Sequence, residues 1–148
     1  MSSVLTANLS PRTWQLLFAT WLISLVATAG ALFIGEVMGM MPCVLCWYQR
    51  IAMFPLVLFL GCALMQQQRA FIVPSLLLSL IGWAVASYHT ALYWGWIDPT
   101  LAPCGDGPSC TMQVLQIFGA VDLPMLSWLA FSVISFLLFL SLKVHSDD

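Results

Sequence analysis

Two pairs of closely spaced cysteines are the residues of this chain best suited to chemistry. Cys43 and Cys46 form a C-x-x-C motif, and Cys104 and Cys110 are separated by five residues. Such pairs can close disulfides, hold a soft metal ion or pass oxidation to other thiols. A structural disulfide stabilises mainly by closing a long loop of the unfolded chain, and both of these loops are short. The spacing therefore favours reactive pairs over structural cross-links.

Two polar residues within apolar segments accompany the first pair. Arg50 follows Cys46 by four residues and Cys43 by seven, so the three side chains are expected on one stripe of a helix. Pro42 suits the first position of that helix, where peptide dipoles stabilise a thiolate. At 1.5 Å per residue, His89 lies roughly 27 Å along a later apolar segment, at the same depth. A cation and an imidazole beside lipid suit a carbonyl-bearing, lipid-soluble electron acceptor. These residues do not specify which acceptor it is.

The composition indicates which elements must position these groups. Hydrophobic residues make up 61% of the 148 and charged residues 7%, with four Lys and Arg against six Asp and Glu. A soluble domain carries roughly 25% charged residues, so the chain is predicted to be an integral membrane protein in a lipid bilayer. Four basic residues are too few to neutralise a phosphate backbone, which excludes nucleic acid as a partner.

Four continuous apolar segments are each long enough to cross a bilayer as a helix. Their continuity favours helices over the alternating strands of a β-barrel. The expected fold is all-α: one membrane domain over residues 1–148, built as a four-helix transmembrane bundle. The expected helices cover residues 14–34, 43–65, 71–94 and 123–142, and residues 95–122 form one long outer loop that carries a short interfacial helix.

The charges between the spans predict the orientation of the bundle. With a cytoplasmic amino terminus, Arg12, Arg69 and Lys143 lie inside, and the two outer connections hold acidic residues but no Lys or Arg. The positive-inside rule therefore predicts that both termini are cytoplasmic and that both cysteine pairs face the oxidising side. Residues 27–29 resemble a signal-peptide cleavage site, but the apolar run continues beyond them, so the first helix is expected to be retained.

The long outer loop surrounds its cysteine pair with turn-forming residues. The sequence PCGDGPSC over residues 103–110 is expected to expose this pair, and exposed disulfides are the exchange-competent ones. Apolar residues three apart over residues 111–118 predict the interfacial helix. Asp122 and Pro124 are suited to cap and begin the last helix. Cys62 lies mid-span and is expected to be a small apolar residue without a redox role.

Zinc binding and structural cross-linking are the competing uses of the four paired cysteines. Two C-x-x-C knuckles would be a strong zinc signal, but the second pair is C-x₅-C and faces a compartment that oxidises thiols. No metal is therefore expected. A membrane scaffold or metal-binding subunit with structural disulfides stays open as an alternative, because the sequence does not show whether the pairs cycle.

These motifs together resemble the DsbB family of membrane thiol oxidoreductases. Residues 42–50 (PCVLCWYQR) resemble its C-x-x-C followed by an arginine, and Tyr88-His89-Thr90 resembles the histidine segment of its third helix. The dipeptides that resemble the approach to its last helix are Ser109-Cys110, Phe118-Gly119 and Leu123-Pro124. The short spacing of the loop pair is similar to that of the BdbC-like members.

The resemblance implies a bacterial inner-membrane protein, with its cysteine pairs facing the periplasm, that re-oxidises a thioredoxin-fold dithiol oxidase of the DsbA type. Cys104 is then implied to form the mixed disulfide with this partner, and Cys110 to resolve it. Cys43 is implied to receive the exchange from the loop pair. Cys46 is implied to be the thiolate against the ring of a membrane quinone that accepts the electrons.

The same resemblance implies that Arg50 and His89 lie near the quinone head group. Ubiquinone and menaquinone are not distinguished. A relay similar to the vitamin K epoxide reductase family is the second enzyme alternative, since that family also combines thiol pairs in a helical bundle with a quinone-like substrate. There the C-x-x-C follows the loop pair, whereas here it precedes it, so the chain order disfavours this alternative.

Overall fold

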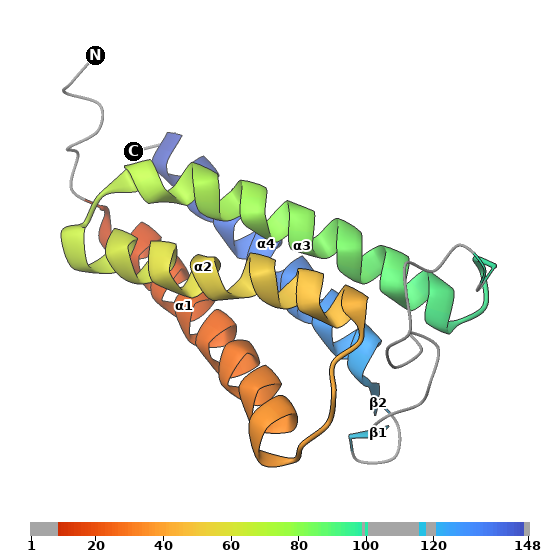
Figure 1. The fold of residues 1–148 in the computed structure, drawn as a ribbon. Helices are drawn as coiled ribbons and strands as arrows, with labels where there is room; N and C mark the ends of the chain where they lie inside the picture. The colour runs from red at the N-terminus through yellow and green to blue at the C-terminus, as the bar shows by residue number, and fades with distance from the viewer. Residues whose placement is uncertain (1–8, 99, 101–115, 118–120, 147–148) are drawn as a thin grey trace.

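Four long helices form the protein in a computed structural model that describes residues 9–98, 100, 116–117 and 121–146 (Figure 1). They are α1 (Pro11–Leu32), α2 (Val44–Gln66), α3 (Ile72–Tyr93) and α4 (Leu123–Ser146). Each belongs to a segment long and apolar enough to cross a membrane. The all-α membrane bundle expected from the sequence is therefore confirmed, with helix boundaries within a few residues of those expected.

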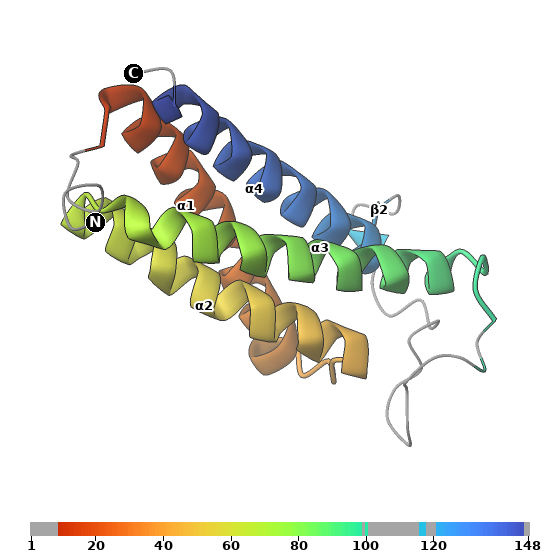
Figure 2. The same ribbon diagram turned by 90° about the horizontal axis from the view of Figure 1, so that it is seen from above.

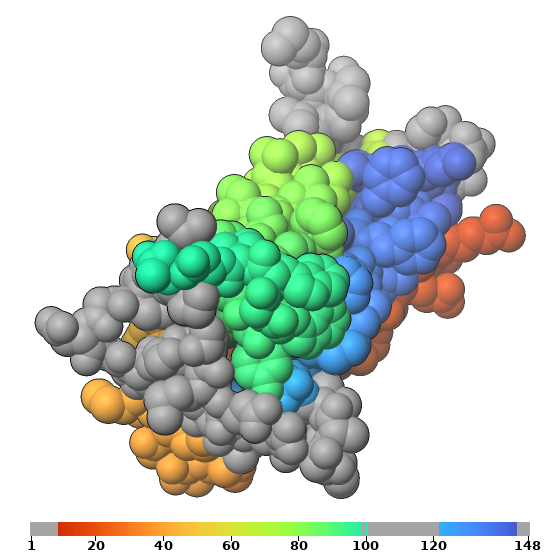
Figure 3. Space-filling view, turned by 90° about the vertical axis from the view of Figure 1, so that its right-hand side faces the viewer, coloured from red at the N-terminus to blue at the C-terminus, as the bar shows by residue number. Residues whose placement is uncertain are grey.

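The helices form a closed ring of neighbours. α1 packs against α2 and α4, and α3 packs against the same two helices (Figure 2). α1 begins and α4 ends at one end of the bundle, whereas α2 begins and α3 ends at the opposite end. Figure 3 looks onto that opposite end, with the end of α3 in green beside the start of α4 in blue. This up-and-down order brings the start of α2 and the end of α3 to the same depth.

Local sequence explains where the helices begin and end. Ser10 caps α1 by accepting a hydrogen bond from the backbone N–H of Thr13, and Pro11 takes the first helical position, which needs no N–H donor. α1 continues into a π-helix, η1 (Phe33–Val37). α2 ends at Gln67, whose φ of 51° is left-handed, and a 3₁₀ turn, η2 (Arg69–Phe71), leads into α3.

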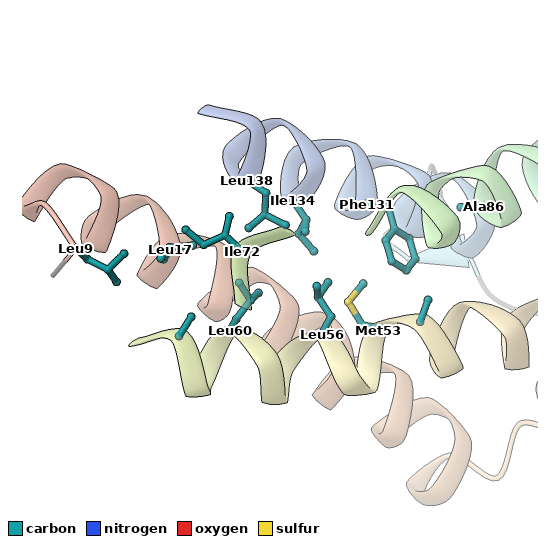
Figure 4. Packing of buried hydrophobic residues seen from close by; sticks show 12 residues of the cluster. Leu9, Leu17, Met53, Leu56, Leu60, Ile72, Ala86, Phe131, Ile134 and Leu138 are labelled. Atoms are coloured by element: carbon teal, nitrogen blue, oxygen red, sulfur yellow. The ribbon is translucent and has the colours of Figure 1, made fainter. Parts of the chain in front are cut away.

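Apolar side chains from all four helices fill the interior (Figure 4). At one crossing Phe131 of α4 lies directly on Gly82 of α3, where any larger residue would overlap its ring. Outward-facing side chains such as Leu77 and Phe136 are also apolar and exposed, as lipid-facing residues are. Inter-helix hydrogen bonds add to the α3–α4 contact, with donor and acceptor atoms 3.0 Å apart in each: Trp83 to Ser132, Trp128 to Ser87 and Ser135 to Ser79.

The described part of the connection between α3 and α4 corrects one expectation. β1 (Gln116–Ile117) pairs antiparallel with β2 (Val121–Asp122), with Gln116 opposite Asp122. The interfacial helix predicted over residues 111–118 is therefore wrong for Gln116 and Ile117, and its other residues lie outside the described ones. α4 begins at Leu123 as expected, with Pro124 in its first turn.

Candidate redox site

Cys43 and Cys46 lie at the start of α2, at the end of the bundle where α3 terminates. Cys43 is the N-cap, and its sulfur accepts a hydrogen bond from the backbone N–H of Cys46 at 3.4 Å. Pro42 therefore precedes the cap instead of taking the first helical position, because the cysteine sulfur does the capping. The two Sγ atoms are in hydrogen-bond contact at 2.9 Å, and both cysteines are free. Since a disulfide bond measures about 2.05 Å, a shift of roughly 1 Å brings them to bonding distance.

His89 reaches this pair from the last turns of α3. Its Nε2 atom lies 3.8 Å from Sγ of Cys43, within the range of a hydrogen bond to sulfur, and its side chain is only 3% exposed. The sequence placed His89 at the depth of Cys46 and Arg50. The structure brings its ring onto Cys43, which is the sulfur that caps the helix.

Gln49 is a member of this cluster that sequence reasoning did not single out. Its Nε2 atom lies 3.2 Å from Nδ1 of His89, and the side chain is 7% exposed. Gln49 follows Cys46 by three residues, so both occupy one side of α2. A polar residue inside a membrane-spanning helix was the available signal, because such residues commonly hydrogen-bond across helices.

Arg50 turns toward α1. Its Nη2 atom donates a hydrogen bond to the backbone carbonyl of Ala31 at 2.7 Å, and its guanidinium carbon lies 5.5 Å from the centroid of the Trp47 ring. The acceptor lies just before η1, and π-helical turns are frequent at functional sites. The charge of Arg50 remains close enough to act on Cys46. Arg50 therefore combines an anchoring contact to α1 with a positive charge beside the sulfur pair.

The donors of the site converge on Cys43. The pKa of the Cys43 thiol is held well below its usual value, chiefly by the hydrogen bond with Cys46 and further by His89 and by the backbone N–H of Cys46, whereas burial alone would raise it. Cys43 is therefore the sulfur of the reduced pair that ionises more readily. The role of Cys46 against the quinone, implied by the family resemblance, stays a prediction.

The comparison with known proteins identifies the family. The protein-family model described as "Disulfide bond formation protein DsbB" matches residues 11–143. The chain belongs to the DsbB family. It is 48% identical to the "Probable disulfide formation protein" of Metapseudomonas resinovorans, over 87% of this chain and 90% of that one. It is 35% identical to the "Disulfide bond formation protein C" of Bacillus subtilis, over 80% and 86% of the two chains. No solved structure matches the chain.

Membership of the DsbB family confirms the resemblance drawn from the cysteine, arginine and histidine motifs. It supports a disulfide oxidoreductase activity carried by a membrane helical bundle. Two of the expected site residues of this DsbB-family chain, Cys104 and Cys110, lie outside the residues that the structure describes. Cys62 is free and half-buried within α2.

The described site of this DsbB-family chain also offers three of the ligands that a metal ion could use. One ligand atom each from Cys43, Cys46 and His89 lie within 4.8 Å of one another. Zinc binds sulfur and imidazole nitrogen, but a structural zinc site uses four protein ligands and a catalytic site three plus water. The sequence analysis considered zinc bound by four cysteines. The cluster found among the described residues instead has three ligands, two cysteines and one histidine.

Proposed function

We propose that this protein is a quinone-dependent thiol oxidoreductase that re-oxidises an extracytoplasmic thioredoxin-fold dithiol oxidase of the DsbA type. The observation that carries the proposal is the contact of Cys43 with both Cys46 and His89 at one end of a membrane-spanning bundle. A dithiol there can be oxidised to a disulfide by a lipid-soluble electron acceptor. The disulfide can then oxidise thiols outside the bilayer by thiol–disulfide exchange. The family supports thiol oxidation as the reaction class.

The route of electrons follows the order of thiol exchange. The dithiol of the partner attacks the Cys104–Cys110 disulfide, leaves as a disulfide and reduces the loop pair. The loop pair then reduces the Cys43–Cys46 disulfide in the same way, since each step is attack of a thiolate on a disulfide sulfur. Two electrons and two protons pass finally to the quinone, which becomes a hydroquinone. The balance is one partner disulfide formed for each quinone reduced.

The geometry supports specific tasks for the residues of the described site. Cys43 and Cys46, with their Sγ atoms 2.9 Å apart, are placed to close a disulfide when the pair gives up two electrons and two protons, which a bound quinone would accept. His89, 3.8 Å from Sγ of Cys43, stabilises that sulfur as a thiolate. Arg50 would supply positive charge to the oxygen of a bound acceptor as that oxygen gains electrons, as transition-state stabilisation requires. Ubiquinone and menaquinone both fit this chemistry.

We place the protein in a bacterial inner membrane with both termini in the cytoplasm and the cysteine pairs facing the periplasm. The basic residues support this orientation: Arg12 and Lys143 lie at the end of the bundle where α1 begins and α4 ends, and Arg69 lies between α2 and α3 at that same end. The redox pair lies at the opposite end. The positive-inside rule then assigns the redox pair to the outer side.

A coupled assay tests the proposal. Purified protein in lipid nanodiscs is mixed with a reduced thioredoxin-fold oxidase and either a ubiquinone or a menaquinone analogue, and quinone absorbance and partner thiols are followed together. We expect equal loss of quinone and of partner dithiol. Cys46→Ser and Cys104→Ser should each abolish turnover, whereas Cys62→Ser should retain it. Turnover by Cys46→Ser at the wild-type rate would contradict the proposed mechanism.

Zinc binding is the second candidate function, favoured by the three clustered ligand atoms of Cys43, Cys46 and His89. The two candidates differ in what the reduced site does. A zinc subunit should retain about one metal ion per chain after chelation and keep its thiols reduced when quinone is added. A redox relay should lose those thiols on addition of quinone, with or without prior chelation.

A further inference from the structure

Gln49 enters the redox site through one contact, between its amide nitrogen and Nδ1 of His89 at 3.2 Å. An amide nitrogen donates hydrogen bonds and does not accept them, so Nδ1 must be the acceptor in this contact. A neutral imidazole whose Nδ1 is unprotonated carries its single proton on Nε2. The contact with Gln49 therefore decides which ring nitrogen of His89 bears the proton.

The other ring nitrogen faces the redox pair. Nε2 of His89 lies 3.8 Å from Sγ of Cys43 and is buried with it. A proton on Nε2 makes this a hydrogen bond from the ring to the sulfur, whereas a bare Nε2 would present a lone pair to a thiolate. Gln49 and Cys43 are both on the first two turns of α2 or its cap, and His89 bridges them from α3.

We propose that Gln49 is a positioning residue that holds His89 as the neutral Nε2–H tautomer, aimed as a hydrogen-bond donor at the sulfur of Cys43. An imidazolium would place an Nδ1–H against the amide N–H, so two donors would face each other. A neutral ring avoids this conflict and still donates to the thiolate. His89 thus stabilises Cys43 as a thiolate without removing a proton from it. The role of this contact in turnover rests on the proposed function, but the tautomer itself is a property of the folded protein.

Two side chains around Cys43 act on its ionisation. They are Cys46 of α2 and His89 of α3, and both favour the thiolate. The guanidinium of Arg50 donates its hydrogen bond to the Ala31 carbonyl of α1. A hydrogen bond to a charged group is typically stronger than one between neutral groups, so a correctly placed Nε2–H matters most while Cys43 is ionised.

Nitrogen NMR of the ring measures the tautomer directly. The chain has two histidines, His89 and His145, so ¹⁵N-histidine labelling gives two ring spectra, and His89→Asn assigns them. In the reduced wild-type protein we expect Nδ1 of His89 to be unprotonated and Nε2 to be protonated. Gln49→Glu should move a proton onto Nδ1, because a carboxylate can only accept. Gln66→Leu, the same residue type at the far, exposed end of α2, should leave the spectrum unchanged.

Two NMR results would overturn the inference. The first is a protonated Nδ1 in the wild-type protein, which would mean that the amide oxygen of Gln49 faces the ring or that His89 is an imidazolium. The second is an unchanged His89 spectrum in Gln49→Glu, which would mean that residue 49 does not control the ring. A circular dichroism spectrum equal to that of the wild type establishes that each variant is folded.

Alkylation of Cys43 gives a functional readout that a purely structural role would not move. In the reduced protein, the rate is followed against pH by peptide mapping. Because Gln49→Leu removes the bias toward the Nε2–H donor, we expect the midpoint of Cys43 alkylation to rise by roughly half to one pH unit, equivalent to a threefold to tenfold change in the ionisation constant. An unchanged midpoint would contradict the inference. Neither measurement uses quinone or partner, so a protein with this tautomer that fails to reduce quinone would contradict the proposed function alone.

Discussion

Arg50 of α2 donates a hydrogen bond to the backbone carbonyl of Ala31 on α1 at 2.7 Å, and this contact ties the two helices together beside the sulfur pair. Gly35 of η1 makes room for it, because a Cβ atom at that position would lie 3.0 and 3.1 Å from Nη2 and Nη1 of Arg50. The position of the guanidinium therefore depends on a glycine in a different helical segment. Gly35 thus contributes to the redox site by leaving the space that the guanidinium of Arg50 occupies.

Replacing Gly35 by alanine should displace the guanidinium without unfolding the bundle, since the tip of an arginine can move. We expect quinone turnover to fall by about fivefold, as for loss of one hydrogen bond of about 1 kcal/mol. Gly30→Ala is the matched control, because a Cβ atom at Gly30 meets nothing within 4 Å. Equal turnover of the two variants would show that the placement of Arg50 is unimportant.

Replacing Gly82 by alanine should destabilise the fold. The added Cβ would overlap the ring of Phe131, so α3 and α4 would have to separate or the ring would have to move. Overpacking of this kind typically costs about 1–3 kcal/mol. Thermal unfolding in detergent should show a lower midpoint for Gly82→Ala and recovery in Gly82→Ala with Phe131→Leu. A single variant as stable as the wild type would contradict this packing.

The reduced pair should react with alkylating agents well below the pH at which an ordinary cysteine does. The lowered pKa of Cys43 means that its thiolate is present at neutral pH and is lost only as the pH falls through that lowered value. Cys43 should therefore alkylate at nearly the same rate at pH 8 and pH 6, whereas an ordinary thiol slows by about tenfold per pH unit over this range.

Removing the hydrogen bond between Cys43 and Cys46 should give Cys43 the pH dependence of alkylation of an ordinary cysteine. Since the hydrogen bond with Cys46 contributes most to the lowered pKa, Cys46→Ala should move the alkylation midpoint of Cys43 to higher pH. Cys62→Ala leaves the site untouched and should not. If Cys43 in the otherwise unaltered reduced protein slowed in proportion to hydroxide concentration between pH 8 and pH 6, Cys43 would not be the thiolate.

The sequence was most informative where one physical rule dominates. Continuous apolar runs predicted four helices, because a helix satisfies its own backbone hydrogen bonds within lipid and the strands of a barrel would alternate in polarity. The depth of His89 along its span placed it level with Cys46, since helix rise fixes depth. α2 begins at Val44, one residue later than expected, because Cys43 is its N-cap and Pro42 precedes that cap.

Side-chain direction was harder to predict than depth. Arg50 occupies the expected register on α2, but its choice of the Ala31 carbonyl depends on how closely α1 approaches and on the absence of a side chain at Gly35. Gln49 was missed because an uncharged amide carries no charge or redox signature. Its role is visible only when α3 brings His89 to it.

A single-turnover experiment tests the central claim, that the Cys43–Cys46 pair hands two electrons to a membrane quinone, most directly. A variant with Cys104→Ser and Cys110→Ser is fully reduced, freed of reductant and mixed anaerobically with a quinone analogue. We predict loss of one quinone per chain together with formation of the Cys43–Cys46 disulfide, and neither change in Cys46→Ser. Quinone that stays oxidised while the two thiols stay free would contradict the account.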